Sequence, residues 1–266
     1  MRKIFFIFLA VAATTSLFGQ QTKKEKKEEH RKKINALIKQ EEEGVITYSK
    51  HTVFGFKLTN DGYGAFMEVG RAQSIKKSLL FQLDISERKH NKEDKQTNPS
   101  YAGPSLIFGK INFFYPVKLG VQQQILLGNK SNKNGVSITG NFGGGISIGL
   151  LRPYFLEVND SSIQHRKFIR FESADSNVFS DNKQLYNLNA TGPNLGKGWG
   201  NLKITPGLYA KAALRFDYGR YNEVVSAIEV GVTAEYYSKK IPQLVFTTPK
   251  NLFINVYVAI MFGKRK

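Results

Sequence analysis

Residues 107–126, IFGKINFFYPVKLGVQQQIL, alternate between two kinds of side chain. One set of alternate positions is mostly apolar and comprises Gly109, Ile111, Phe113, Tyr115, Val117, Leu119, Val121, Gln123 and Ile125. The intervening set is mostly polar and comprises Lys110, Asn112, Phe114, Pro116, Lys118, Gly120, Gln122 and Gln124. Successive side chains of a β-strand point to opposite faces. The pattern therefore predicts one long strand with a different environment on each side.

The same alternation recurs along much of the chain. The segments that show it are residues 52–59, 63–71, 78–87, 136–150, 202–218, 224–236 and 252–262. Together with residues 107–126 they make about eight strands, the even number found in bacterial single-chain outer-membrane barrels. The sequence thus predicts an all-β protein, an antiparallel transmembrane β-barrel of about eight strands.

The lengths of the connections predict how the barrel is oriented. With both ends of the strand region on one side, that side has three short turns, at residues 72–77, 128–135 and 219–223. The other side has the connections 60–62, 88–103, 159–201 and 239–250, of which three are long. Outer-membrane barrels have short periplasmic turns and longer external loops. We therefore expect an outer-membrane location with both termini in the periplasm.

Three prolines fall inside the predicted strands, where proline removes a ladder hydrogen bond. Pro153 and Pro206 flank the long connection and are interpreted as the points where the ladder ends. Pro116 lies near the middle of a strand and is expected to need a bulge.

The predicted inward faces carry charges of both signs, which could pair across strands. These residues are Lys57, Glu68, Asp84, Lys110, Lys118, Lys211, Arg215, Glu229 and Glu235. A barrel of about eight strands is only wide enough inside for its own side chains. A packed polar core is therefore favoured over a pore, and a narrow channel or small-solute transporter is the alternative.

The N-terminal region differs from the strand region. Residues 1–20 begin with Arg2 and Lys3, continue with a short apolar run and end in small and polar residues, which is the pattern of a secretory signal peptide. Residues 21–44 are highly charged and end at Gly44, a residue typical of a helix C-terminus. We expect a charged periplasmic helix or arm there, followed by the outer-membrane barrel in residues 45–266.

One narrow apolar stripe interrupts the charged segment. Ile34, Leu37 and Ile38 have the spacing of a single helical face. A helix this polar cannot be held by core burial. It is either a solvated arm or a docking helix that places these three side chains on a partner or on the barrel rim.

The chain is basic and has no cysteine. It contains 39 Lys and Arg against 21 Asp and Glu, a formal net charge of +18. The absence of cysteine excludes disulfides and a lipid-modified cysteine. We expect no nucleic acid as partner of an exported chain. The counter-charges are instead outer-membrane lipid, including lipopolysaccharide, or acidic outer-membrane and periplasmic proteins; a general solubility role is the alternative.

The residue pattern gives little support for catalysis or metal binding. His165 lies near Asp160 and Ser161, and His90 lies near Asp94, but spacing alone does not make a catalytic triad. No histidine pair has metal-ligand spacing, and neither a phosphate-binding glycine loop nor a calcium loop is present. We predict no enzyme activity, no catalytic residue, no metal and no cofactor.

Residues 192–200 form a glycine-rich stretch that contains Trp199, the single tryptophan. This stretch could contact a partner, or it could be a structured turn of the long connection. We predict Trp199 as a partner-binding residue together with Ile34, Leu37 and Ile38.

Several short motifs resemble one family. They are GFKLTNDG at residues 55–62, FGKIN at 108–112, IGLLRPY at 148–154, LYAKA at 208–212 and FGKRK at 262–266. As a set they resemble small outer-membrane β-barrel proteins of the Bacteroidota, over most of the chain after Thr52. The chain departs from the usual terminal aromatic, because a basic tail follows Phe262. The family offers no catalytic residues to transfer.

The resemblance implies an accessory subunit of an outer-membrane machine. The outer-membrane protein assembly machinery is the first interpretation, and the gliding and protein-secretion apparatus is the second. Our leading hypothesis is a non-enzymatic structural or accessory subunit, whose barrel anchors while the charged helix and the 159–201 connection make contacts. The alternatives are a narrow channel and, after it, a hydrolase or acyltransferase at the barrel rim.

Overall fold

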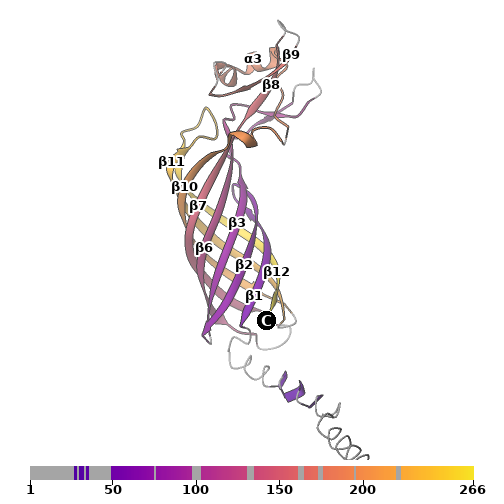
Figure 1. The fold of residues 1–266 in the computed structure, drawn as a ribbon, viewed down its shortest axis with the longest axis vertical. Helices are drawn as coiled ribbons and strands as arrows, with labels where there is room; N and C mark the ends of the chain where they lie inside the picture. The colour runs from indigo at the N-terminus through magenta and orange to yellow at the C-terminus, as the bar shows by residue number, and fades with distance from the viewer. Residues whose placement is uncertain are drawn as a thin grey trace, which may run out of the picture.

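Eight long strands close into one antiparallel barrel (Figure 1). The computed structural model describes residues 27–28, 30–32, 34–35, 49–74, 76–97, 103–130, 135–160, 165–172, 176–194, 196–219 and 223–266. The barrel strands are β1 (Lys50–Thr59), β2 (Gly62–Ser74), β3 (Lys77–Arg88), β6 (Asn112–Gly128), β7 (Ser137–Pro153), β10 (Lys203–Asp217), β11 (Val224–Ile241) and β12 (Lys250–Arg265). Their order around the barrel is β1-β12-β11-β10-β7-β6-β3-β2. The predicted fold class is confirmed.

The barrel closes where its first and last strands pair. Thr52 of β1 lies opposite Lys264 of β12, and the Ser49 backbone N–H donates to the Lys266 carbonyl at 2.9 Å. The start of β1 and the end of β12 therefore share one rim, which we call the terminal end. The opposite rim is called the loop end.

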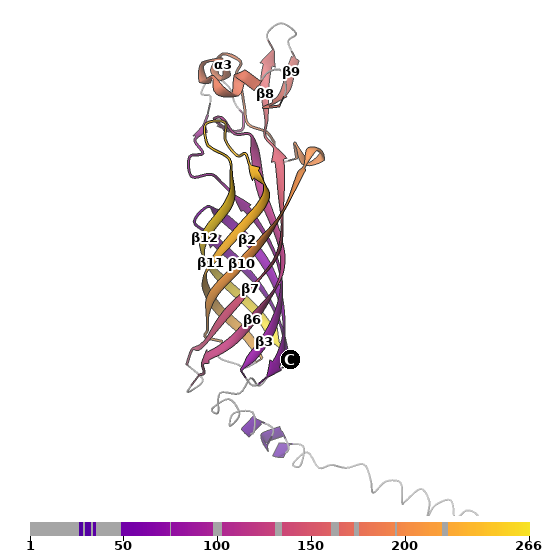
Figure 2. The ribbon, with the colours of Figure 1, turned by 90° about the vertical axis from the view of Figure 1, so that its left-hand side faces the viewer.

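The connections differ in length between these two ends, as predicted. At the terminal end they are residues 75–76, 129–136 and 218–223. At the loop end they are residues 60–61, 89–111, 154–202 and 242–249. The two longest connections, residues 89–111 and 154–202, are both at the loop end and rise above the barrel (Figure 2). The third connection predicted to be long, now residues 242–249, is only as long as residues 129–136 at the terminal end, because β11 and β12 extend further than predicted.

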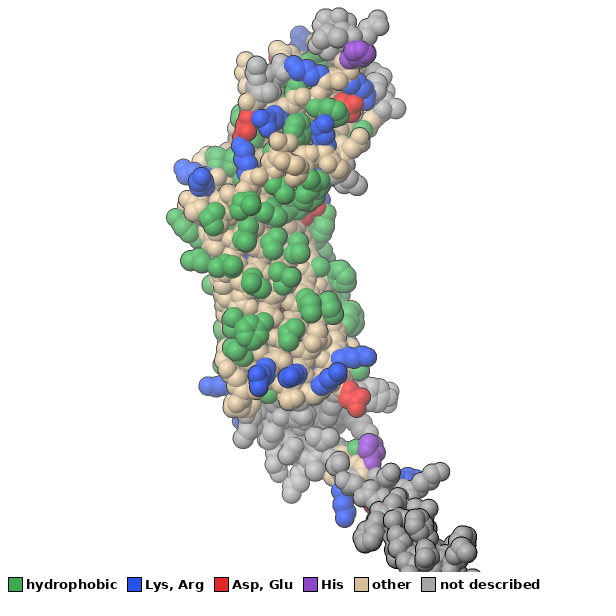
Figure 3. All heavy atoms as spheres, in the orientation of Figure 1, with side chains coloured by type: hydrophobic (Ala, Val, Ile, Leu, Met, Phe, Trp, Pro, Cys, Tyr) green, Lys and Arg blue, Asp and Glu red, His purple; other side chains and the backbone are tan. Residues whose placement is uncertain are grey.

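The barrel has an apolar outer wall and a mostly polar interior. Two smaller apolar clusters are also buried inside it, one that includes Val53 and Met261 near the terminal end and one that includes Phe114 and Tyr237 near the loop end. Along β12 every second residue is exposed, and Ile254, Val256 and Val258 expose 64%, 54% and 47% of their surface. Figure 3 shows apolar side chains over the visible barrel wall and a row of basic side chains near the terminal end. The alternating faces predicted for residues 112–124 are confirmed, because the even positions are buried and the odd ones are not. The outside suits hydrocarbon, as on the lipid-facing side of a transmembrane barrel.

The strand predicted at residues 107–126 is one strand, but it starts later than expected. β6 begins at Asn112, whereas β5 (Leu106–Ile107) pairs with β4 (Lys95–Gln96) beyond the barrel. The bulge expected at Pro116 is wrong. The β3–β6 register is the same on both sides of Pro116, and the ladder to β3 skips Pro116 and its neighbour Tyr115. A ladder gap on one side accommodates the missing N–H without an inserted residue.

The other two prolines lie at ladder ends, as predicted. Pro153 is the last residue of β7. Pro206 pairs with Ile148 of β7 and directly precedes Gly207, where the ladder between β10 and β11 begins.

The connection between β7 and β10 folds into a structured cap, which we define as residues 154–202. It contains a hairpin of β8 (Phe155–Asp160) and β9 (His165–Arg170), the short helices η1 (Ser176–Ser180), α3 (Asn182–Asn187) and η2 (Trp199–Asn201). The Asp181 carboxylate caps α3 by accepting from the backbone N–H groups of Lys183 and Gln184. The connection begins at residue 154 rather than 159, since β7 stops at Pro153. The sequence predicted the connection but not its internal structure.

The N-terminal region is described only in part. Residues 27–28, 30–32 and 34–35 are helical, in agreement with the predicted helix, whose remainder lies outside the described residues together with residues 1–20. Among the described residues, no helix is long and apolar enough to cross a bilayer.

Candidate functional site

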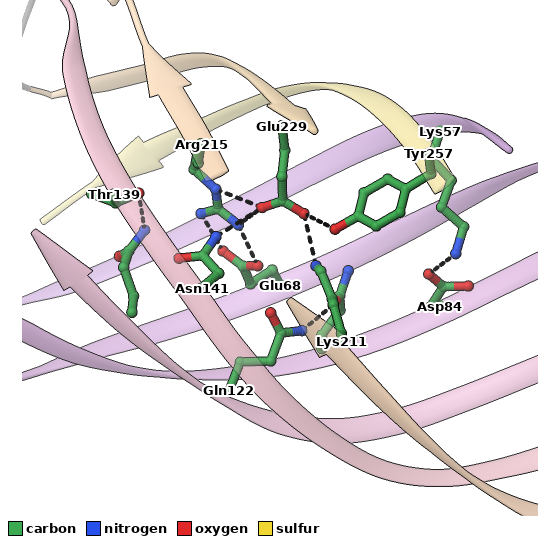
Figure 4. A network of polar contacts seen from close by, with 12 residues as sticks. Lys57, Glu68, Asp84, Gln122, Thr139, Asn141, Lys211, Arg215, Glu229 and Tyr257 are labelled. Atoms are coloured by element: carbon green, nitrogen blue, oxygen red, sulfur yellow. Dashed lines mark hydrogen bonds and ion pairs between the residues drawn. The ribbon is translucent and has the colours of Figure 1, made fainter. Parts of the chain in front are cut away.

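The barrel interior contains a buried ion network centred on Arg215 of β10 (Figure 4). The Arg215 guanidinium donates from Nη1 and Nη2 to the two carboxylate oxygens of Glu68, at 2.7 and 2.8 Å. It also donates from Nε and Nη2 to Glu229 Oε2, at 2.9 and 2.7 Å. Both glutamates are completely buried. One guanidinium thus joins β2, β10 and β11 across the lumen.

Further donors complete the shell around the Glu229 carboxylate. Its Oε1 lies 2.7 Å from Lys211 Nζ and accepts from the Tyr257 hydroxyl at 2.7 Å. The Asn141 side-chain amide donates to Oε2 at 2.8 Å. A buried charge is costly unless it is paired and hydrogen-bonded. Glu229 of β11 meets this condition through residues of three other strands, β7, β10 and β12.

A second network lies nearer the loop end. Lys118 Nζ lies 2.8 Å from Glu235 Oε1 and 3.6 Å from Asp84 Oδ1. Arg88 also pairs with Glu235, and Lys57 pairs with Asp84. All nine residues predicted to point inward are buried, and eight of them belong to these two networks. The ninth, Lys110, lies above the barrel strands and pairs with Glu93 at 2.7 Å.

The space between the two networks is small. A cavity lined by Lys57, Gln82, Lys118, Tyr209 and Thr233, among others, has room for about one water molecule. Ion pairs that span the lumen at two levels leave a filled interior. This arrangement stabilises the barrel and does not favour the narrow channel.

The cap has a core of the opposite chemical type. Its buried residues are Leu106, Ile107, Tyr154, Leu156, Val158, Ile169, Phe179, Leu185, Ala190 and Leu244. Leu106, Ile107 and Leu244 come from the connections at residues 89–111 and 242–249, so three loop-end connections share one core. The Tyr154 hydroxyl accepts from the Ile107 backbone N–H at 2.8 Å, a hydrogen bond that joins the 154–202 and 89–111 connections. These connections therefore form a packed unit.

The cap exposes aromatic and basic side chains. Phe168 and Tyr186 expose 40% and 55% of their surface. Lys197 Nζ lies 3.8 Å from the centre of the Phe168 ring, within the range of a cation–π contact. Exposed aromatic residues beside basic ones are typical of protein interaction surfaces.

Trp199 packs against the barrel wall rather than projecting from the cap. Its ring stacks on Tyr115 of β6 with centroids 5.4 Å apart, and the Arg152 guanidinium lies 5.0 Å from its ring centre. Trp199 keeps 47% of its surface exposed at the loop end of the apolar wall. Aromatic residues commonly occupy such positions in the girdles of membrane barrels. Its predicted role in partner binding stays a prediction.

The predicted apolar stripe of the N-terminal helix is described only at Ile34, which is helical and 40% exposed. Leu37 and Ile38 lie outside the described residues. The docking role of this stripe therefore also stays a prediction.

The two histidines weighed for catalysis do not form triads in the described part of the chain. His165 lies opposite Asp160 in the β8–β9 ladder, and Ser161 is outside the described residues. His90 Nδ1 accepts from the Lys92 backbone N–H at 3.2 Å, whereas Asp94 accepts from the Gln96 amide. No three potential metal ligands cluster among the described residues.

Comparisons with known proteins give only distant structural likenesses. No protein-family model and no curated protein sequence matches the chain. Similar solved structures include Neisserial surface protein A, with 9% identity, 82% of this chain and 96% of that chain covered, and a TM-score of 0.37. The N-terminal β-barrel domain of Pseudomonas aeruginosa OprF has 8% identity, coverage of 81% and 98%, and a TM-score of 0.35. The attachment invasion locus protein Ail of Yersinia pestis has 8% identity, coverage of 82% and 97%, and a TM-score of 0.35.

Proposed function

We propose that the protein is a non-enzymatic subunit of an outer-membrane protein complex, in which the barrel anchors and the cap makes contacts. The terminal end faces the periplasm and the cap faces outward. The apolar wall supports the membrane location. The short connections at the terminal end and the long ones at the loop end support the orientation.

The observation that carries this proposal is the separate core of the cap. A barrel needs only short turns to close, yet residues 154–202 bury Leu156, Phe179 and Leu185 beyond the barrel. Long connections with their own structure are commonly functional. With the lumen filled by ion pairs, the surface available for function is the cap and the N-terminal segment.

The complex we propose first is the outer-membrane protein assembly machinery, with the protein acting as an accessory subunit. This step rests on the family resemblance of the five sequence motifs. The charged N-terminal segment would then lie in the periplasm beside periplasmic partners, with Ile34, Leu37 and Ile38 as its apolar contact residues.

The test is purification of the tagged full-length protein from its native membrane in a mild detergent, followed by mass spectrometry. We expect stoichiometric protein partners, and we expect their loss or marked depletion in the cap variant Phe168→Ser with Tyr186→Ser. Deletion of residues 21–44 tests the N-terminal contact separately. The matched control is Phe246→Ser, which changes an aromatic residue that is 59% exposed at the loop end but lies outside the cap.

Two results would overturn the proposal. One is recovery of the full-length protein as a monomer without stoichiometric partners. The other is an unchanged set of partners in the cap variant and in the N-terminal deletion. If the partners are found but are not assembly factors, the accessory role stands and the identity of the machine is wrong.

A further inference from the structure

A pocket of about 340 Å³ opens at the loop end beside the first residues of β12. Four segments build it: the β1–β2 turn, the start of the 89–111 connection, the 242–249 connection and the beginning of β12. Its lining residues are Asn60, Asp61, Lys89, His90, Asn91, Lys92, Gln243, Lys250, Leu252, Phe253, Ile254 and Asn255. All of them belong to the described part of the chain.

The polar side of this pocket is positively charged. Lys89, Lys92 and Lys250 line it together with His90, and none of the three lysines has an ion-pair partner among the described residues. Asp61 is the one acidic lining residue, and its carboxylate already accepts from the Thr59 hydroxyl at 3.0 Å and lies 3.6 Å from Arg88 Nε. Lys89 Nζ lies 5.1 Å from the centre of the Tyr63 ring, but no described carboxylate neutralises any of the three lysine charges, so they can attract an anionic ligand.

The surroundings of His90 agree with this concentration of charge. Its pKa lies below the ordinary value for histidine, first because of partial burial and then because Lys250, Lys92 and Lys110 lie near it, although Glu93 acts in the opposite direction. Positive charge gathered at one pocket favours a multivalent anion such as a phosphate group.

The other side of the pocket continues onto the lipid-facing wall. Leu252 and Ile254 point outward and expose 51% and 64% of their surface. Leu58 of the adjacent strand β1 exposes 70% on the same wall. A basic pocket for a free anion would not need an apolar strip beside it. Basic groups above an apolar strip instead match an amphiphile with an anionic head and hydrocarbon chains.

We propose that this pocket binds the phosphate-bearing headgroup of an acylated membrane lipid, whose chains lie along Leu252, Ile254 and Leu58. The inference requires that the barrel lies in a membrane but not that it belongs to a complex. The terminal end provides a contrast: Lys50 of β1, Lys77 of β3 and Lys264 of β12 are exposed there, but none of them lines this pocket. Surface charge without a pocket gives weak and unselective lipid contact.

The test is native mass spectrometry of the full-length protein in detergent with lipid A that carries two phosphates. Two probes separate the sources of the anion: the same acylated disaccharide without phosphates, and inorganic phosphate. The pocket variant is Lys89→Gln, Lys92→Gln and Lys250→Gln. The control variant is Lys50→Gln, Lys77→Gln and Lys264→Gln, which removes the same charge at the other end.

We expect the pocket variant to bind lipid A at least about tenfold more weakly, a change of about 1.4 kcal/mol. The control variant is expected to bind it within about twofold of the unchanged protein. Removal of the phosphates should weaken binding to the unchanged protein, and inorganic phosphate at millimolar concentration should not displace the lipid. Leu252→Ser with Ile254→Ser should also weaken lipid binding.

Heat-modifiable migration on gels checks that each variant has a folded barrel. Full lipid A binding by a folded pocket variant would overturn the proposal, as would an equal loss in the control variant. Binding of inorganic phosphate as tight as that of lipid A would show an anion site that does not recognise a lipid. Loss of protein partners has no bearing on these readouts, so the two proposals fail independently.

Discussion

The barrel and the cap have opposite interiors. The barrel buries Glu68, Arg215 and Glu229 and exposes residues such as Val256 and Ile260. The cap buries residues such as Leu156 and Phe179 around its own apolar core. This difference in buried residues reflects the surroundings of each region, which are hydrocarbon for the barrel wall and water for the cap. In hydrocarbon an apolar outer surface is stable, so polar and charged side chains pair inside the barrel. In water the apolar side chains are buried instead.

The largest effect is expected from breaking the polar core of the barrel. Arg215→Leu leaves two buried carboxylates without their main partner, and loss of one member of a buried ion network costs about 4 kcal/mol. Equilibrium unfolding in detergent with urea measures the change. The matched control is Arg166→Leu, which breaks the more exposed Arg166–Glu157 pair of the cap and should cost less than about 1 kcal/mol. Equal losses of unfolding free energy in Arg215→Leu and Arg166→Leu would contradict the expected difference between the buried network and the more exposed pair.

The corresponding change in the cap is Leu156→Ala, which opens a cavity in an apolar core. We expect a cost of about 3 kcal/mol, confined to the cap. Hydrogen exchange followed by mass spectrometry should show faster exchange in residues 154–202 and unchanged exchange in β10 to β12. Leu208→Ala, at a lipid-facing position that is 63% exposed, should leave exchange in the cap unchanged. Faster exchange throughout the barrel after Leu156→Ala would mean that the two cores unfold together.

The outer wall gives a smaller effect that depends on depth. Val232 lies near the middle of β11, opposite Val256 of β12, and Val232→Lys should destabilise the folded barrel by about 2 kcal/mol. Leu252→Lys, close to the loop end, should cost less than about 1 kcal/mol. Folding titrations into lipid vesicles compare the two variants. A greater cost at Leu252 would mean that the membrane does not lie across the middle of the wall.

The smallest effect concerns the titration of His90 at the loop end. Its pKa is lowered in the folded protein, so the unfolded chain binds more protons and folding stability falls slightly as the pH drops through and below about 6.5. NMR of the histidine ring should give a midpoint below that value. Lys92→Gln with Lys250→Gln should raise the midpoint, while Lys50→Gln should not. If the midpoint is unchanged in the double variant, the charges of Lys92 and Lys250 do not affect the titration of His90.

The sequence predicted the barrel well because lipid-facing strands carry a strong period of two. Glu68, Lys118 and Glu229 could be placed inside from alternation alone, since each falls between outward apolar neighbours. The start of β6 was placed too early, because the alternation continues from residue 107 although the ladder to β7 begins at Asn112. Side-chain pattern alone does not show where a partner strand ends.

The cap could not be predicted in the same way. Its strands and helices are no longer than six residues, too short to show a clear period, and its core joins residues distant in sequence, such as Ile107 and Leu244. The basic pocket at the loop end could not be predicted from the sequence for a related reason. Lys89 and Lys250 are far apart along the chain, and only barrel closure brings β12 beside the β1–β2 turn.

We propose that the protein contacts its partners through the cap while the barrel wall faces lipid. A photo-crosslinking amino acid placed at Phe168 of the cap, and separately at Val232 of the wall, tests this claim most directly in living cells. We expect a discrete protein adduct from position 168, and lipid adducts without a discrete protein adduct from position 232. A discrete protein adduct from position 232, with none from position 168, would contradict it.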